Sequence, residues 1–111
     1  MLRAVAPGMI HIIWEFRVRP GKEAEFENHY SDQGTWAKFF RQDPGYHGTQ
    51  LVRDAADPHR YVTIDAWDDE SAYGAFRVTY REQYNAIDKQ MEALTESEKR
   101  IGVFQVVASG K

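Results

Sequence analysis

Side chains able to move a proton or orient a ligand gather in two segments of this 111-residue chain. Asn28 and His29 lie near the end of the run RPGKEAEFENHY, and Tyr80 and Tyr84 are four residues apart in a later periodic run. His29 is the candidate general base, because an unperturbed imidazole has a pKa of about 6.5. Tyr80 lies on an apolar stripe, where its hydroxyl needs either a ligand or a backbone carbonyl as partner. We predict His29 and Tyr80 as catalytic residues and Asn28 and Tyr84 as substrate contacts.

Aromatic side chains could supply walls that hold a planar ligand beside these groups. Aromatic residues make up 14% of the chain, and the further candidates for substrate binding are Trp14, Trp36, Phe40 and Phe76. Ordinary core packing is the stronger explanation for Phe40 and Phe76. Trp14 and Trp36 carry an N–H donor that is awkward to bury without a partner, which favours a ligand contact.

Several other chemistries have no support in the sequence. The absence of cysteine excludes thiolate catalysis, disulfides and cysteine-based zinc sites. The motifs G-x-S-x-G, G-x-x-x-x-G-K-[ST] and G-x-G-x-x-G are all missing. The four histidines, His11, His29, His47 and His59, lack the spacing of a metal-binding motif. We therefore predict neither a metal nor another cofactor.

Composition sets the class of protein and its partners. The length fits one domain, predicted over 9–107 between a flexible tail at 1–8 and a short tail at 108–111. A net charge of -3 without a basic run predicts binding to neither nucleic acid nor a membrane surface. The opening MLRAVAPG is too short for a signal peptide and lacks an apolar core of the usual length, so a cytoplasmic location is expected.

Hydrophobic periodicity predicts six elements in the order strand, helix, strand, strand, helix, strand. The second helix has the clearest pattern, an apolar or aromatic residue every three or four positions up to roughly Leu94. Gly34 interrupts the first helix, so a break is expected near Ser31 to Thr35. The expected ranges are 9–19, 22–40, 45–54, 60–67, 70–94 and 99–107. This order is typical of the ferredoxin-like α+β fold, a four-stranded antiparallel sheet with two helices on one face.

The junction RYVTIDAWDDESAYGAF raises the question of whether it forms a site or a joint. Carboxylates at 68–70 begin the second helix, where they cap free backbone N–H groups and oppose the positive end of the helix dipole. If Val62 and Ile64 face the helices, alternation places Trp67 on the opposite sheet face, towards a partner or its rim. We therefore interpret the junction as a joint.

The sheet face away from the helices is expected to be too apolar for open water. Its predicted residues include Ile13, Leu51, Tyr61, Phe104 and Val106. A second copy of the same sheet is the simplest cover, and twofold dimers are the commonest oligomers. We therefore predict a homodimer.

The stretch from Ile10 to Phe104 resembles the antibiotic biosynthesis monooxygenase family of dimeric α+β barrels. The resemblance lies in RPGKEAEFENHY, WAKFFRQDPGYHGTQLVRD and RYVTIDAWDDESAYGAF. It implies a ferredoxin-like protomer, facing sheets in a dimer and a small aromatic ligand between sheet and helices. Characterised relatives oxygenate quinol-like or polyphenolic substrates without flavin, metal or haem.

Three alternatives accompany this expectation. Some relatives degrade haem, but they bind iron through a histidine of the second helix, and no histidine lies between Ser71 and Leu94 here. Those relatives also place an asparagine in the first strand, where this chain carries Trp14. A non-catalytic dimer that binds a small ligand or has a regulatory role is the main alternative. An isomerase or dehydratase on the same barrel would need a base but no dioxygen.

Overall fold

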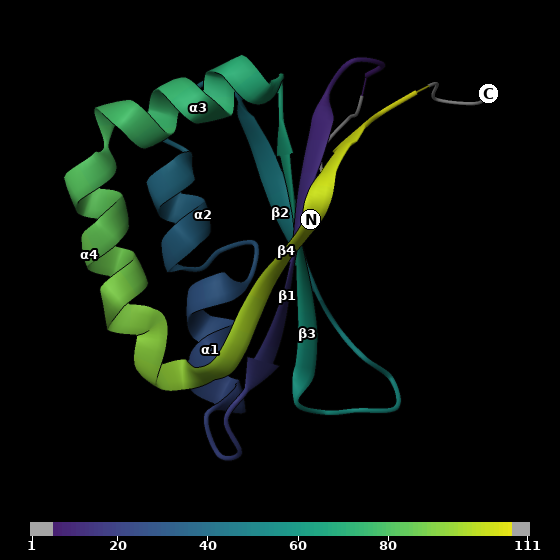
Figure 1. The fold of residues 1–111 in the computed structure, drawn as a ribbon, viewed down its shortest axis with the longest axis vertical. Helices are drawn as coiled ribbons and strands as arrows, with labels where there is room; N and C mark the ends of the chain where they lie inside the picture. The colour runs from purple at the N-terminus through teal and green to yellow at the C-terminus, as the bar shows by residue number, and fades with distance from the viewer. Residues whose placement is uncertain (1–5, 108–111) are drawn as a thin grey trace.

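A computed structural model describes residues 6–107 and confirms the ferredoxin-like fold. The elements run β1 (Ile10–Val18), α1 (Glu23–Tyr30), α2 (Thr35–Phe40), β2 (Tyr46–Arg53), β3 (Arg60–Trp67), α3 (Glu70–Thr79), α4 (Arg81–Met91) and β4 (Thr95–Gln105), with a 3-10 turn (Glu92–Leu94) before β4. The antiparallel sheet has the order β2-β3-β1-β4. All four helices cover one face (Figure 1). Residues 1–5 of the predicted tail at 1–8, and the predicted tail at 108–111, lie outside the described residues.

Close backbone contact explains the predicted break in the first helical segment. A Cβ on Gly34 would come within 2.6 Å of the backbone of His29 and 2.7 Å of Asn28. Only glycine allows the start of α2 to approach the end of α1 this closely. The break confirms the prediction, and α1 and α2 are two separate helices on the same side of the sheet (Figure 1).

The second helix was predicted as one continuous element to Leu94, and this was wrong. Tyr80 leaves the helical region at φ -111° and ψ 31°, which separates α3 from α4. Helical hydrogen bonds still run from Tyr80 N to Phe76 O and from Tyr84 N to Tyr80 O, both at 2.9 Å. Because the bonding continues on both sides, the three-to-four-residue spacing persists through the bend and hides it in the sequence.

The start of the last strand was also predicted wrongly, four residues too late. β4 begins at Thr95 because Val18 pairs with Thr95 at the far end of β1. The run TESEK has no strand-like hydrophobic pattern, so the pairing with β1, including two register shifts, determines this part of the strand.

The face of β3 that lies under the helices is the opposite of the one considered from the sequence. Trp67 pairs with Ile10 and is fully buried on the helix-covered face, where its ring lies 5.5 Å from Phe76. Tyr61 lies on the same face, 4.9 Å from the ring of Phe26. Trp67 is therefore a core residue, and its expected place at a dimer rim was wrong.

The junction after β3 nevertheless is a joint. Asp69 occupies the position before α3, and its carboxylate accepts a hydrogen bond of 2.8 Å from Ala72 N. This confirms the predicted capping role for Asp69, whereas Asp68 pairs with His47 at 2.6 Å.

The outer sheet face is apolar but smaller than predicted. Ile13 and Ile64 are paired neighbours on it, and Phe104 is 49% exposed. Leu51 and Tyr61 were wrongly assigned to it, since both pack against the core beneath the helices. No helix in the described part of the chain is long and apolar enough to cross a membrane.

Candidate active site

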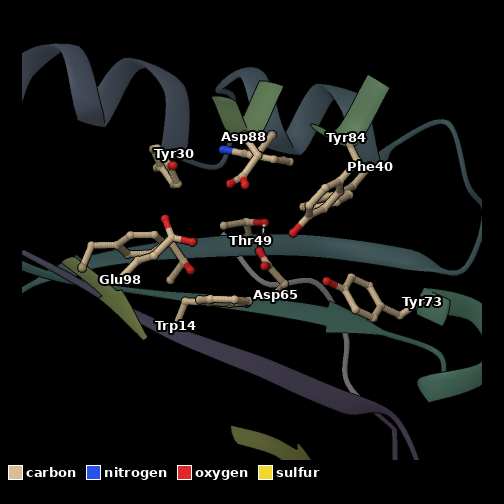
Figure 2. A pocket seen from close by; sticks show the side chains of 12 residues that line it. Trp14, Tyr30, Phe40, Thr49, Asp65, Tyr73, Tyr84, Asp88 and Glu98 are labelled. Atoms are coloured by element: carbon tan, nitrogen blue, oxygen red, sulfur yellow. Dashed lines mark hydrogen bonds between the residues drawn. The ribbon is translucent and has the colours of Figure 1, made fainter. Parts of the chain in front are cut away.

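A cleft lies between the helix-covered face of the sheet and the helices. Its aromatic lining comes from β1, α1, α2, α3 and α4 and consists of Trp14, Phe16, Tyr30, Trp36, Phe40, Tyr73 and Tyr84. Its polar lining consists of Thr49, Thr63, Asp65, Asp88 and Glu98. Figure 2 shows these groups facing a common space, with Trp14 on the sheet side and Asp88 and Tyr84 on the helical side.

The cleft is narrow in this conformation. Its volume is about 470 Å³, counting the part open to solvent. This volume falls in the range of small-molecule sites, but aromatic rings crowd it, and those of Trp36 and Tyr84 have centroids only 5.0 Å apart. A planar ligand therefore requires lining side chains to rotate outwards as it enters.

Four of the eight predicted site residues meet at this cleft. Trp14, Trp36, Phe40 and Tyr84 line it, and the rings of Trp36 and Tyr84 are 5.0 Å apart. Trp36 and Phe40 are also buried in the core, with ring centroids 5.7 Å apart. Trp36 and Phe40 therefore line the cleft and pack in the core at the same time.

The other four predicted residues lie outside the lining. His29 is half-buried, with Nδ1 2.7 Å from Thr35 Oγ1 at the junction of α1 and α2. Asn28 is exposed. Phe76 is 1% exposed and packs 4.7 Å from the ring of Tyr80 in the core. Catalytic roles for His29 and Tyr80 stay predictions.

Asp65 is one of several ionisable groups in the cleft that were not predicted from the sequence. Burial raises the pKa of the Asp65 carboxyl to about 6, against a partial lowering by the Thr49 hydrogen bond. Thr49 donates to Asp65 Oδ1 at 2.5 Å, and the Thr49 hydroxyl lies 2.5 Å from the Tyr46 hydroxyl. A carboxylate held by one oxygen, with its pKa near neutrality, can accept a proton from a ligand.

A sequence signal for Asp65 did exist. It is a lone carboxylate at the centre of the alternating strand RYVTIDAW, on the face shared with Tyr61 and Trp67. That face was expected to be the outer one, and no role was predicted for Asp65. Assigning the large ring of Trp67 to the core would have placed Asp65 under the helices.

Two tyrosines bring hydroxyl groups to the same part of the cleft. In Figure 2 the hydroxyls of Tyr73 and Tyr84 point towards Asp65 and Thr49. Arg77 donates to the Tyr73 hydroxyl at 3.1 Å, and its guanidinium lies 3.7 Å from the centre of the Tyr84 ring. Burial raises the pKa of Tyr84, so its hydroxyl stays a protonated donor near neutral pH.

Removing the hydroxyl of Thr49 should change the proton affinity of Asp65. The Thr49 hydrogen bond favours the ionised carboxylate, so Thr49→Val should raise the Asp65 pKa further, by about one unit. A carbon-detected NMR titration of the aspartate carboxyls measures this directly. Thr63→Val is the matched control, because Thr63 lines the cleft without a bond to Asp65 in the described structure. An Asp65 pKa that moves equally in both variants would contradict the assigned bond.

Comparisons with known proteins cover most of the chain. The family model for antibiotic biosynthesis monooxygenase matches residues 9–86. SnoaB, a cofactor-independent oxygenase from Streptomyces nogalater, is 24% identical, with 92% of this chain and 96% of that chain covered at a TM-score of 0.73. PA3566 from Pseudomonas aeruginosa is 19% identical, with 96% and 100% covered at 0.62. No curated protein is significantly similar in sequence.

Proposed function

Because the chain belongs to the antibiotic biosynthesis monooxygenase family, we propose that it is a cofactor-independent monooxygenase acting on a quinol-like or polyphenolic aromatic compound. The observation that carries this proposal is a carboxylate, Asp65, with its pKa raised to about 6 inside an aromatic cleft. The likeness to SnoaB, itself a cofactor-independent oxygenase, supports the same reaction class.

Asp65 starts the proposed reaction by removing the phenolic proton of the substrate. The anion adds dioxygen at a ring carbon that carries hydrogen, and one new C–O bond gives a hydroperoxide once a proton returns. The C–H bond of that ring carbon then loses its proton and its electron pair forms the carbonyl, while the O–O bond breaks and the outer oxygen leaves as hydroxide, which takes up a proton to become water. Phenol and dioxygen thus become quinone and water, with the substrate supplying all the electrons.

Other lining groups position the substrate and protect the intermediate. Trp14 and Trp36 offer flat faces for a planar ring. The hydroxyls of Tyr73 and Tyr84 can donate hydrogen bonds to an oxygen that gains negative charge. The narrow aromatic cleft keeps bulk water from the anion once side chains pack around the ligand.

Oxygen uptake in the presence of a chelator tests this function. Anthrone and 1,5-dihydroxynaphthalene are suitable probes, because each has a ring carbon that can become a quinone carbonyl. With ¹⁸O₂ the quinone should gain one labelled oxygen and water the other. Tight binding of these probes without oxygen uptake would instead identify a non-catalytic ligand-binding protein, the alternative function.

We also propose that a second copy of the chain covers the outer sheet face. A charge in its centre should disrupt that contact, so Ile13→Asp should convert a dimer to monomers in sedimentation experiments. Val78→Asp is the matched control, since Val78 is 65% exposed on α3 and away from the sheet. A wild-type monomer at micromolar concentration would refute the proposed dimer.

A further inference from the structure

The charged side chains that line the cleft are all acidic. Its lining in the described chain contains three carboxylates, Asp65, Asp88 and Glu98, and no lysine, arginine or histidine. Asp88 comes from α4 and Glu98 from β4, and Figure 2 shows both at the end of the cleft beside Tyr30. A ligand in this cleft therefore meets negative charge from the sheet and from the helices.

The charge of Arg77 interacts with that of Asp88 over a longer distance than an ion pair, and no cation pairs directly with Asp88 or Glu98 in the described chain. Neither side chain forms an ion pair or a hydrogen bond within residues 6–107. Burial, followed by the charges of Asp88 and Glu92, raises the pKa of Glu98. Two unpaired carboxylates that repel each other are costly in a partly buried cleft, and a positively charged ligand group would relieve that cost.

Aromatic rings surround the same end of the cleft. Tyr30 and Trp36 have ring centroids 6.2 Å apart, and Trp14 lies opposite on β1. Trp36 is 8% exposed, and its buried indole N–H lies near the Tyr30 hydroxyl without reaching hydrogen-bond geometry. Electron-rich rings next to carboxylates are the usual environment for an organic ammonium group, which both attract.

A metal ion fits this end less well than an ammonium group. The described residues contain no group of three or more His, Cys, Asp or Glu side chains that could hold a metal ion. Flat aromatic walls also suit an organic cation better than a small hydrated one. The overall charge of -3 adds a weak long-range attraction for cations.

From these observations we propose that the cleft selects planar aromatic compounds that carry an amine, protonated at neutral pH, and rejects aromatic carboxylates. Asp88 and Glu98 bind the ammonium group, and Trp14, Tyr30 and Trp36 surround it. The ring then extends towards Asp65. This inference rests on the proposed function, because it takes the same cleft as the substrate site and adds the charge of the substrate.

Three matched naphthalenes test the charge preference without any oxidation, because none has a phenolic hydroxyl. They are 1-naphthylmethylamine, 1-naphthalenemethanol and 1-naphthoate, with binding measured by isothermal titration calorimetry at pH 7.5. The amine should bind at least about tenfold more tightly than the alcohol, the equivalent of roughly 1.4 kcal/mol. The naphthoate should bind at least about tenfold more weakly than the alcohol.

Variants assign the preference to the two carboxylates. Asp88→Asn combined with Glu98→Gln should reduce the advantage of the amine over the alcohol to less than about threefold, while the alcohol binds as before. Glu96→Gln is the control, since Glu96 is an exposed carboxylate on β4 outside the lining. This control should keep the full preference of the wild type.

The outcomes separate this inference from the oxygenase proposal. Equal binding of amine and alcohol by the wild type, or a preference unchanged in the double variant, overturns the ammonium subsite and leaves the oxygenase proposal standing. An amine preference that disappears in the double variant supports the subsite, even where anthrone and 1,5-dihydroxynaphthalene cause no oxygen uptake. Absence of oxygen uptake together with that amine preference would refute the oxygenase proposal, and the protein would then be a binding protein for aromatic amines.

Discussion

Replacing Asp65 by asparagine should lower quinone formation by at least about 100-fold, the usual contribution of a positioned general base. Asparagine keeps the shape of the side chain and can still accept the Thr49 hydrogen bond, but it cannot take a proton. The wild-type rate should rise with pH through about 6 and then level off, following ionisation of Asp65. The residual activity of Asp65→Asn should lack this rise.

The same substitution should make the folded protein more stable at neutral pH. The pKa of Asp65 is about 6 in the folded chain, above its ordinary value of 3.8. Between these two values the folded state holds a proton that the unfolded state has lost, so this carboxyl reduces stability as pH rises towards 6. Asp65→Asn removes that cost and should gain roughly 1 to 3 kcal/mol at pH 7.5, and almost nothing at pH 4.

Urea denaturation at the two pH values, together with turnover, tests both effects of Asp65→Asn. Thr63→Val serves as control, since Thr63 lies nearby on the same strand but carries no charge. Lower activity combined with higher stability would separate a catalytic role from simple damage to the fold. An asparagine variant with wild-type turnover would remove Asp65 from the mechanism and return His29 and Tyr80 as candidates for the base.

Replacing Trp67 by alanine should cost about 3 to 5 kcal/mol of unfolding free energy, as for other large core rings. Trp67 is fully buried, and four rings surround it with centroids 5.3 to 5.5 Å away, those of Phe40, Tyr46, Tyr73 and Phe76. The cavity left by the indole cannot close without moving these rings. Urea denaturation at one fixed protein concentration measures the loss, since stability of a dimer depends on concentration.

Trp14→Ala is the matched comparison, because it removes the same ring from the wall of the cleft. Trp14 is only partly buried and has one ring neighbour, Phe16 at 6.5 Å. Its loss should cost clearly less stability than the loss of Trp67 and weaken ligand binding by about tenfold. A Trp67→Ala variant that loses less than about 1 kcal/mol would contradict the assignment of Trp67 to the core.

The break before α2 and the cap of α3 could be predicted from the sequence because both depend on local chemistry. Gly34 marked the break between α1 and α2, and Asp69 capped α3, because both effects depend on a few neighbouring backbone groups. The order of elements and the bounds of β3 could likewise be predicted, since alternation over 60–67 is a local property of the chain. Resemblance to the family also came from these short segments.

Which face of each strand lies under the helices was decided only by tertiary structure. β3 alternates two faces of similar hydrophobicity, Val62 and Ile64 on one and Tyr61 and Trp67 on the other, so periodicity fixes the alternation but not its direction. Pairing of Trp67 with Ile10 places the larger rings against the helices and brings Asp65 into the cleft with them. Asp88 and Glu98, from α4 and β4, join it there because antiparallel pairing of β4 with β1 carries the chain back across the sheet.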